Sequence, residues 1–125
     1  MKLVLDSSLV IDHLRIKKLS TAFFETWKSH DFVMSLVTVA ELYSGKSVQP
    51  PGPAREELED ILSGLHIVTP TVKTVKLVGD LRARYQLSLG DAFVAALALE
   101  MKLPVLTLDT KDFKQVKDIT LYRSG

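Results

Sequence analysis

The chain begins with a short apolar segment that ends on a carboxylate. Residues 3–5 are apolar, and they are followed by Asp6, two serines and a new apolar pattern over residues 9–14. This order predicts a buried strand that leads directly into a helix ending near Arg15. Apolar strands without alternation are typical of parallel sheets covered on both faces, and such sheets bind ligands beyond the carboxyl ends of their strands. Asp6 is therefore expected at a ligand-binding edge.

Strand-like and helix-like segments alternate along the rest of the chain. Strands are expected at residues 31–35, 66–68 and 104–108, with a possible edge strand at 119–122, and helices at 20–29, 38–45, 58–65, 70–85, 88–101 and 109–113. This alternation predicts an α/β fold, a three-layer α/β/α sandwich around a mostly parallel sheet of four to five strands. We interpret the proline-rich loop at residues 49–53 as a connection, so a single domain is expected over residues 1–125.

Three of the expected helices have distinctive side-chain patterns. Helix 88–101 has a body that is apolar on every side, so it should be buried. Residues 20–29 carry one aromatic stripe, which favours a core or subunit contact over stacking on nucleic-acid bases; the stripe consists of Phe23, Phe24 and Trp27. Helix 70–85 should begin at Pro70 and turn four side chains inward, namely Val72, Val75, Val78 and Leu81.

Composition excludes several kinds of chemistry. The chain has no cysteine, which rules out disulfides, thiol catalysis and cysteine-ligated metals. Its three histidines, His13, His30 and His66, lack metal-ligand spacing and are expected at the surface or at helix ends. Any metal should therefore be bound by oxygen. The net charge of +1 does not indicate a nucleic-acid partner. No apolar stretch approaches the roughly 20 residues that span a bilayer, so we expect a cytoplasmic protein without a membrane partner.

Four acidic residues are expected at the carboxyl edge of the sheet. Helices that link parallel strands run antiparallel to them, so each helix begins at that edge. Asp6 ends the first strand, and Asp109 directly follows the fourth. Glu41 lies in the first turn expected after the second strand, and Asp91 opens helix 88–101. If the first and fourth strands are neighbours, the four carboxylates converge.

Each acid also has an alternative role as a helix cap. Residues 38–41 and 88–91 have the spacing of capping boxes, and Asp6 and Asp109 are placed to cap the turns that follow them. Four carboxylates within several ångströms would nevertheless repel one another, and each would need a proton or a cation. Mg²⁺ or Mn²⁺ prefers carboxylate oxygens and bridges to substrate phosphates. The expected cluster therefore favours metal-assisted phosphoryl transfer.

Four segments together carry a family resemblance. The chain resembles the PIN-domain ribonucleases, most closely the VapC-type toxins of toxin–antitoxin pairs. The resemblance covers essentially the whole chain and rests on the order and spacing of residues 5–15 (LDSSLVIDHLR), 38–45 (TVAELYSG), 89–96 (LGDAFVAA) and 106–113 (LTLDTKDF).

The resemblance implies a metal pocket in a ribonuclease that is selective for single strands. Asp6 and Asp91 would bind Mg²⁺ or Mn²⁺. Glu41 would bind the metal directly or through water, or would position the attacking water. Asp109 matches the fourth acid, and Asp112 lies one turn further on as the alternative.

The resemblance also implies roles around the pocket. Metal-activated water would attack the scissile phosphate and leave 5′-phosphate and 3′-hydroxyl ends. The hydroxyls of Thr107 and Ser7 would orient carboxylates, unless they serve only as strand-end and cap residues. Three lysines would contact the RNA backbone or form a solvated helix face: Lys111, Lys114 and Lys117. The resemblance suggests a homodimer or higher homo-oligomer, and an antitoxin whose C-terminal segment binds beside the active site.

Two other functions remain open at this point. A response-regulator receiver is also an α/β sandwich with an acidic Mg²⁺ pocket, but it has paired acids after its first strand and a phospho-acceptor Asp at the end of its third. Here Asp6 is followed by two serines, and the third strand ends in Val68-Thr69-Pro70. The other alternative is a non-catalytic binding module of the PIN fold in which the acids serve only as caps.

Overall fold

The computed structural model describes residues 1–15, 30–50 and 52–122. Within them, four parallel strands form one sheet in the order β3-β2-β1-β4. The strands are β1 (Lys2–Leu5), β2 (Asp31–Ser35), β3 (His66–Val68) and β4 (Val105–Leu106). The first and fourth strands are neighbours, as the convergence of the acids requires.

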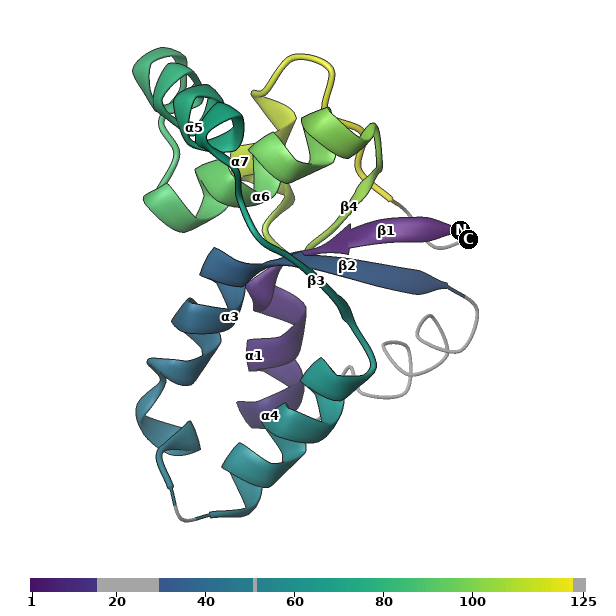
Figure 1. Ribbon diagram of the computed structural model, residues 1–125, viewed down its shortest axis with the longest axis vertical. Helices are drawn as coiled ribbons and strands as arrows, with labels where there is room; N and C mark the ends of the chain where they lie inside the picture. Colours follow the sequence, from purple (N-terminus) through teal and green to yellow (C-terminus); the bar gives the residue numbers. More distant parts are fainter. Residues whose placement is uncertain (16–29, 51, 123–125) are drawn as a thin grey trace.

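Helices cover both faces of this sheet (Figure 1). On one face lie α1 (Ser7–Arg15), α3 (Leu36–Tyr43) and α4 (Pro53–Ser63), with a short 3₁₀ turn, η1 (Lys46–Val48), between the last two. On the other face lie α5 (Val72–Arg84), α6 (Leu89–Met101) and α7 (Thr110–Lys114). The predicted three-layer α/β/α sandwich is confirmed, and its sheet is parallel throughout the described residues.

The unalternating apolar pattern of β1 is explained by the two cores that it separates. Leu3 and Leu5 pack with the apolar residues of α1, α3 and α4. Val4 points the other way and packs with α6. All three side chains are completely buried, so both faces of this strand need apolar residues. The strand is held between β2 and β4, which leaves its carboxyl end, and Asp6, at the middle of the sheet edge.

Helix α3 starts earlier than the sequence suggested. Strand β2 ends at Ser35, and α3 begins at the next residue. The Ser35 hydroxyl caps the helix by accepting a hydrogen bond from the Val37 N–H at 3.2 Å. The expected capping box of Thr38 and Glu41 is therefore wrong, because the first turn is already capped by Ser35. Glu41 lies in the second turn, where its carboxylate has no capping role.

Helix α5 buries a different stripe from the one expected. Thr71 is its N-cap, and Thr71 and Thr74 form a capping box in the first turn. The buried stripe consists of Thr74, Val78 and Leu81, at the spacing of one helix face. Two residues that were expected to face inward, Val72 and Val75, lie off this stripe and are 74% and 52% exposed.

Smaller differences occur at the remaining elements. Strand β4 has two residues instead of the expected five, and the possible edge strand at 119–122 is reduced to one bridge between Val105 and Leu121. The helix expected at residues 20–29, with its aromatic stripe, lies outside the described residues. Among residues 1–15, 30–50 and 52–122, no helix has the length and apolar character needed to cross a bilayer.

One histidine departs from the expected surface position. His13 is only 3% exposed, and its Nε2 lies 2.8 Å from Oε1 of Glu57 in α4. It is buried because α4 packs against α1. His30 is half-buried with its Nε2 3.0 Å from the Tyr122 hydroxyl, and His66 is exposed.

Candidate metal centre

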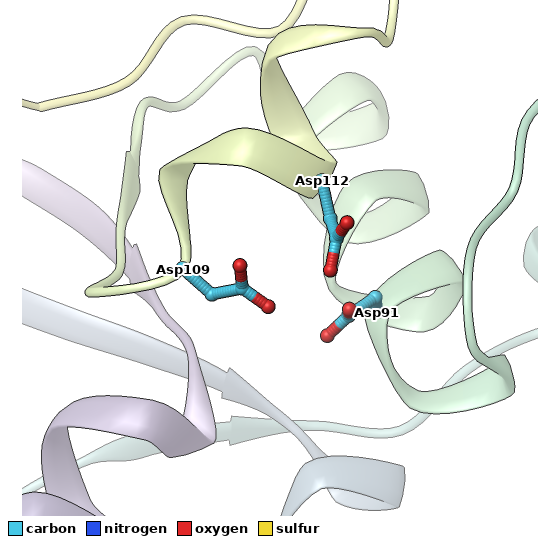
Figure 2. Close-up of side chains that lie close together, drawn as sticks. All are labelled: Asp91, Asp109 and Asp112. Atoms are coloured by element: carbon cyan, nitrogen blue, oxygen red, sulfur yellow. The ribbon is translucent and has the colours of Figure 1, made fainter.

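Three aspartates face one another at the carboxyl edge of the sheet (Figure 2). Asp91 comes from the first turn of α6, Asp109 directly precedes α7, and Asp112 lies within α7. One carboxylate oxygen from each can be chosen so that all three lie within 4.8 Å of one another. The alternatives Asp109 and Asp112 are therefore both present at the cluster.

Asp6 lies at the same edge. It lines an open pocket of about 370 Å³ together with Asp91 and Asp109. Its backbone N–H donates to the Leu106 carbonyl at 3.1 Å, which fixes the end of β1 against β4. The rest of its wall is formed by residues of α1 and the loop after β4, namely Ser7, Ser8, Ile11, Asp12 and Leu108.

A single hydroxyl connects Asp6 to the loop that carries Asp109. Thr107 Oγ1 donates to Oδ2 of Asp6 at 2.7 Å and accepts from the Asp109 N–H at 2.9 Å. Ser8 Oγ lies 3.2 Å from Thr107 Oγ1 and accepts a hydrogen bond from the Leu108 N–H at 3.0 Å. Thr107 thus makes contacts suited to the orienting role expected of it, whereas Ser8, and not the expected Ser7, joins the network.

Removing the Thr107 hydroxyl should loosen this connection. Asp6 and Thr107 are 3% and 8% exposed, so Thr107→Val leaves a buried carboxylate oxygen without its donor. We expect a loss of about 1–3 kcal/mol in the free energy of unfolding, measured by urea denaturation. Thr107→Ser, which keeps the hydroxyl, is the matched control. Equal stability of the two variants would contradict the inferred role of this hydrogen bond.

Glu41 reaches the edge from α3, on the other face of the sheet from α6. Its carboxylate lies against the backbone of Gly90, the residue before Asp91, so closely that a Cβ at position 90 would overlap both carboxylate oxygens. Burial and repulsion from Asp6 raise the pKa of Glu41. The four acids that the sequence singled out are therefore gathered at one edge.

The carboxylates destabilise one another's charged forms. Burial, followed by repulsion from Asp6, Asp109 and Asp112, raises the pKa of Asp91 to about 6, against a smaller opposing effect of a hydrogen bond from Ser88. The pKa of Asp109 is raised by burial, and also by a hydrogen bond with Asp112 and by repulsion from the same residue. The positive charge of Lys111 acts in the opposite direction. The cluster carries more negative charge than its protein neighbours neutralise.

Capping explains little of this arrangement. Asp109 occupies the N-cap position of α7 but makes no capping hydrogen bond. Ser88 is the N-cap of α6 and accepts from the Asp91 N–H at 3.1 Å, which leaves the Asp91 carboxylate directed at the cluster. The expected spacing at residues 88–91 thus marks the cap correctly, but the carboxylates at 91 and 109 are available for another ligand.

The donor set fits a hard divalent cation. The converging groups are all carboxylates, which Mg²⁺ and Mn²⁺ prefer, and a cation would relieve the repulsion that raises the pKa of Asp91. From the sequence, Asp112 was expected only as an alternative to Asp109, and Asp12 was not identified as a site residue. The signal that could have found them is their position shortly after Asp109 and Asp6 in the chain. The lysines at positions 111, 114 and 117 are exposed, two of them on α7 beside the cluster.

Comparison with known proteins supports the fold. A family model described as "PIN domain" matches residues 3–119. The chain is similar in structure to VapBC2 from Rickettsia felis, solved with a promoter DNA fragment, with a TM-score of 0.81, 20% identity and 100% of both chains covered. It is also similar to a toxin–antitoxin complex from Klebsiella pneumoniae, with a TM-score of 0.76 and 23% identity over 98% of this chain and 99% of that one.

A third similar structure is FitAcB from Neisseria gonorrhoeae, with a TM-score of 0.73 and 24% identity over 98% of this chain and 97% of that one. No curated protein matches the chain. At these identities the structural comparisons establish a shared fold, and the chemistry must be argued from the residues themselves.

Proposed function

The chain belongs to the PIN-domain family, and from this we propose that it is a divalent-metal-dependent endoribonuclease and the toxin of a type II toxin–antitoxin pair. The proposal rests on one observation above all. The carboxylates of Asp91, Asp109 and Asp112 crowd together beside Asp6 at the edge of the sheet where parallel folds bind their ligands.

The proposed metal ligands are Asp6, Asp91 and Asp109. Glu41 is proposed as a fourth ligand that binds the metal directly or through water. When bound, Mg²⁺ or Mn²⁺ supplies a positive charge that binds phosphate oxygens and lowers the pKa of water. The protein's own part is to hold its carboxylates in place. Thr107 orients Asp6 through the 2.7 Å hydrogen bond, and the N-cap at Ser88 fixes the turn that carries Asp91.

RNA backbone contacts are proposed for the exposed lysines of α7. Lys111 and Lys114 lie on the short helix that also carries Asp112. Positive charges next to the acidic pocket would attract phosphates, so RNA affinity should fall as the salt concentration rises.

The partners are proposed by analogy with the similar structures. The Klebsiella pneumoniae structure is described as a toxin–antitoxin complex, and we propose an antitoxin protein for this chain as well. We also propose a homodimer or higher homo-oligomer, acting on RNA in the cytoplasm. A receiver is less well supported, because β3 ends at Val68 and is followed by Thr69, where that fold needs an aspartate.

A cleavage assay tests the proposal. We expect the purified protein to cut a single-stranded RNA oligonucleotide when Mg²⁺ or Mn²⁺ is added and to lose this activity in excess EDTA. The products should carry 5′-phosphate and 3′-hydroxyl ends, which enzymatic end-labelling identifies. Incubation with acetyl phosphate is the parallel assay, since phosphorylation of the protein without RNA cleavage would support a receiver and contradict the nuclease proposal.

A further inference from the structure

Gly90 is an unusual residue for its position. It lies buried in the first turn of α6, a helix whose next residues are mostly alanine and other apolar residues. Glycine is among the poorest helix formers, because it loses the most backbone freedom on folding. Its backbone is not in the left-handed region that favours glycine, so conformation does not explain its presence.

The reason lies in what a side chain at this position would meet. The three atoms nearest to a Cβ built on Gly90 are the two carboxylate oxygens and the Cδ of Glu41, all at overlapping distance. Glu41 belongs to α3, on the opposite face of the sheet (Figure 1). The end of its side chain occupies the volume that a methyl group would take on α6.

We propose that Gly90 is a positioning residue for Glu41: the missing side chain leaves the space in which the Glu41 carboxylate lies against α6 and takes part in cation binding. This inference rests on the proposed metal-dependent function. This contact places the Glu41 carboxylate beside Gly90, the residue that precedes Asp91 of the aspartate cluster. The long side chain of a glutamate would otherwise have many rotamers available and no fixed place at the site.

The chain contains a matched control for this position. Gly79 also lies within a helix, α5, and a Cβ there would meet no atom within 4 Å. Gly79→Ala therefore gives the helix-forming gain of alanine without displacing anything. Gly90→Ala gives a similar gain but displaces the Glu41 carboxylate, and the displacement costs little because the obstructing atoms are the end of a flexible side chain.

The experiment compares five proteins: wild type, Gly79→Ala, Gly90→Ala, Glu41→Ala and the double variant that combines Glu41→Ala with Gly90→Ala. The Mn²⁺ dissociation constant is measured by the EPR signal of free Mn²⁺, and the thermal unfolding midpoint by circular dichroism. We expect the dissociation constant to rise about 10-fold or more in Gly90→Ala and in Glu41→Ala. It should rise no further in the double variant and should not change in Gly79→Ala. The midpoint of Gly90→Ala in the absence of metal should not fall.

The outcomes separate this inference from the proposed function. A wild type that neither binds Mn²⁺ nor cleaves RNA overturns the nuclease proposal. A wild type that does both, with Mn²⁺ binding by Gly90→Ala equal to that of Gly79→Ala, overturns only the role of Gly90.

If Gly90 had a purely structural role, Gly90→Ala would weaken Mn²⁺ binding by the same factor in the Glu41→Ala variant as in the wild type. This result would also overturn the inference. If Gly90→Ala alone fails to fold, the double variant decides. Recovery of folding there supports the contact with Glu41, and continued misfolding contradicts it.

Discussion

Asp91→Asn is expected to lower the rate of RNA cleavage at least about 100-fold while the protein stays folded. Asn keeps the size of Asp but replaces one acceptor oxygen with an NH₂ donor and removes the negative charge that would bind the cation. Because Asp91 is partly exposed and capped through its backbone, its side chain is not needed for packing. Asp6→Asn should have a similar effect on cleavage, measured as kcat/KM on a single-stranded RNA.

The stability of Asp91→Asn should change in the opposite direction from its activity. Burial and neighbouring acids raise the pKa of Asp91 to about 6, so its charged form destabilises the metal-free protein at neutral pH. The full shift corresponds to about 3 kcal/mol, which solvent screening of this partly exposed group reduces to about 1 kcal/mol. We therefore expect the variant to be about 1 kcal/mol more stable than wild type at pH 7.5 and equally stable near pH 4.

The control for both measurements is Asp80→Asn, the same change at an exposed position of α5. It should alter neither cleavage nor stability. If Asp91→Asn and Asp6→Asn both cleave RNA at the wild-type rate, the acids are not the catalytic centre, and a non-catalytic binding module with the PIN fold becomes the better description.

Addition of Mn²⁺ is expected to raise the thermal unfolding midpoint strongly at pH 7.5 and only slightly at pH 5. At a Mn²⁺ concentration about 100 times the dissociation constant, binding to the native state adds about 2.7 kcal/mol, or roughly 10 °C for a chain of this size. The effect weakens at low pH because protons compete with the metal for the carboxylates.

The sign of the pH dependence follows from the raised pKa values. Without metal, the protonated carboxyl group of Asp91 contributes stability that is fully present below about pH 4, and this contribution is lost as the pH rises through about 6. Asp109 and Glu41, whose pKa values are also raised, act in the same direction. These groups should therefore favour the metal-free protein at pH 5 over pH 7.5, whereas the Mn²⁺-induced stabilisation should grow with pH.

Differential scanning fluorimetry with and without Mn²⁺ across pH 5–8 checks this prediction, with NaCl of equal ionic strength as the control. Asp91→Asn is the second control and should lose most of the metal-induced rise. A midpoint that does not respond to Mn²⁺ at any pH would contradict the metal centre.

The convergence of three acids could be predicted because it depends on topology alone. Asp6 and Asp109 follow neighbouring parallel strands, and Asp91 opens a helix that must start at the same edge. The apolar pattern places the three acids at this edge, and the condition that the first and fourth strands are neighbours is met by the pairing of β1 with β4. The sequence offered Asp109 and Asp112 as alternatives, but a turn of short helix brings both side chains to one point, which only the structure reveals.

Other features depended on details that the sequence leaves ambiguous. Ser35 and Thr38 are equally suitable N-cap residues, and only the direct passage from β2 into α3 selects Ser35. On α5 the capping threonines set the rotation of the first turn. Val72 is therefore exposed, although the apolar periodicity predicted that it would face inward. The contact of Glu41 with Gly90 joins two helices on opposite faces, and no local pattern reveals it.

The placement of β1 between β2 and β4 has a consequence during protein synthesis. Residues 105–112, which complete the sheet edge beside Asp6 and supply two of its aspartates, are synthesised after the other three strands and α6. A nascent chain that lacks them has Asp6 and Asp91 but neither β4 nor α7 to close the site. If the proposed function holds, a chain that stops before this stretch should therefore lack metal-dependent RNA cleavage.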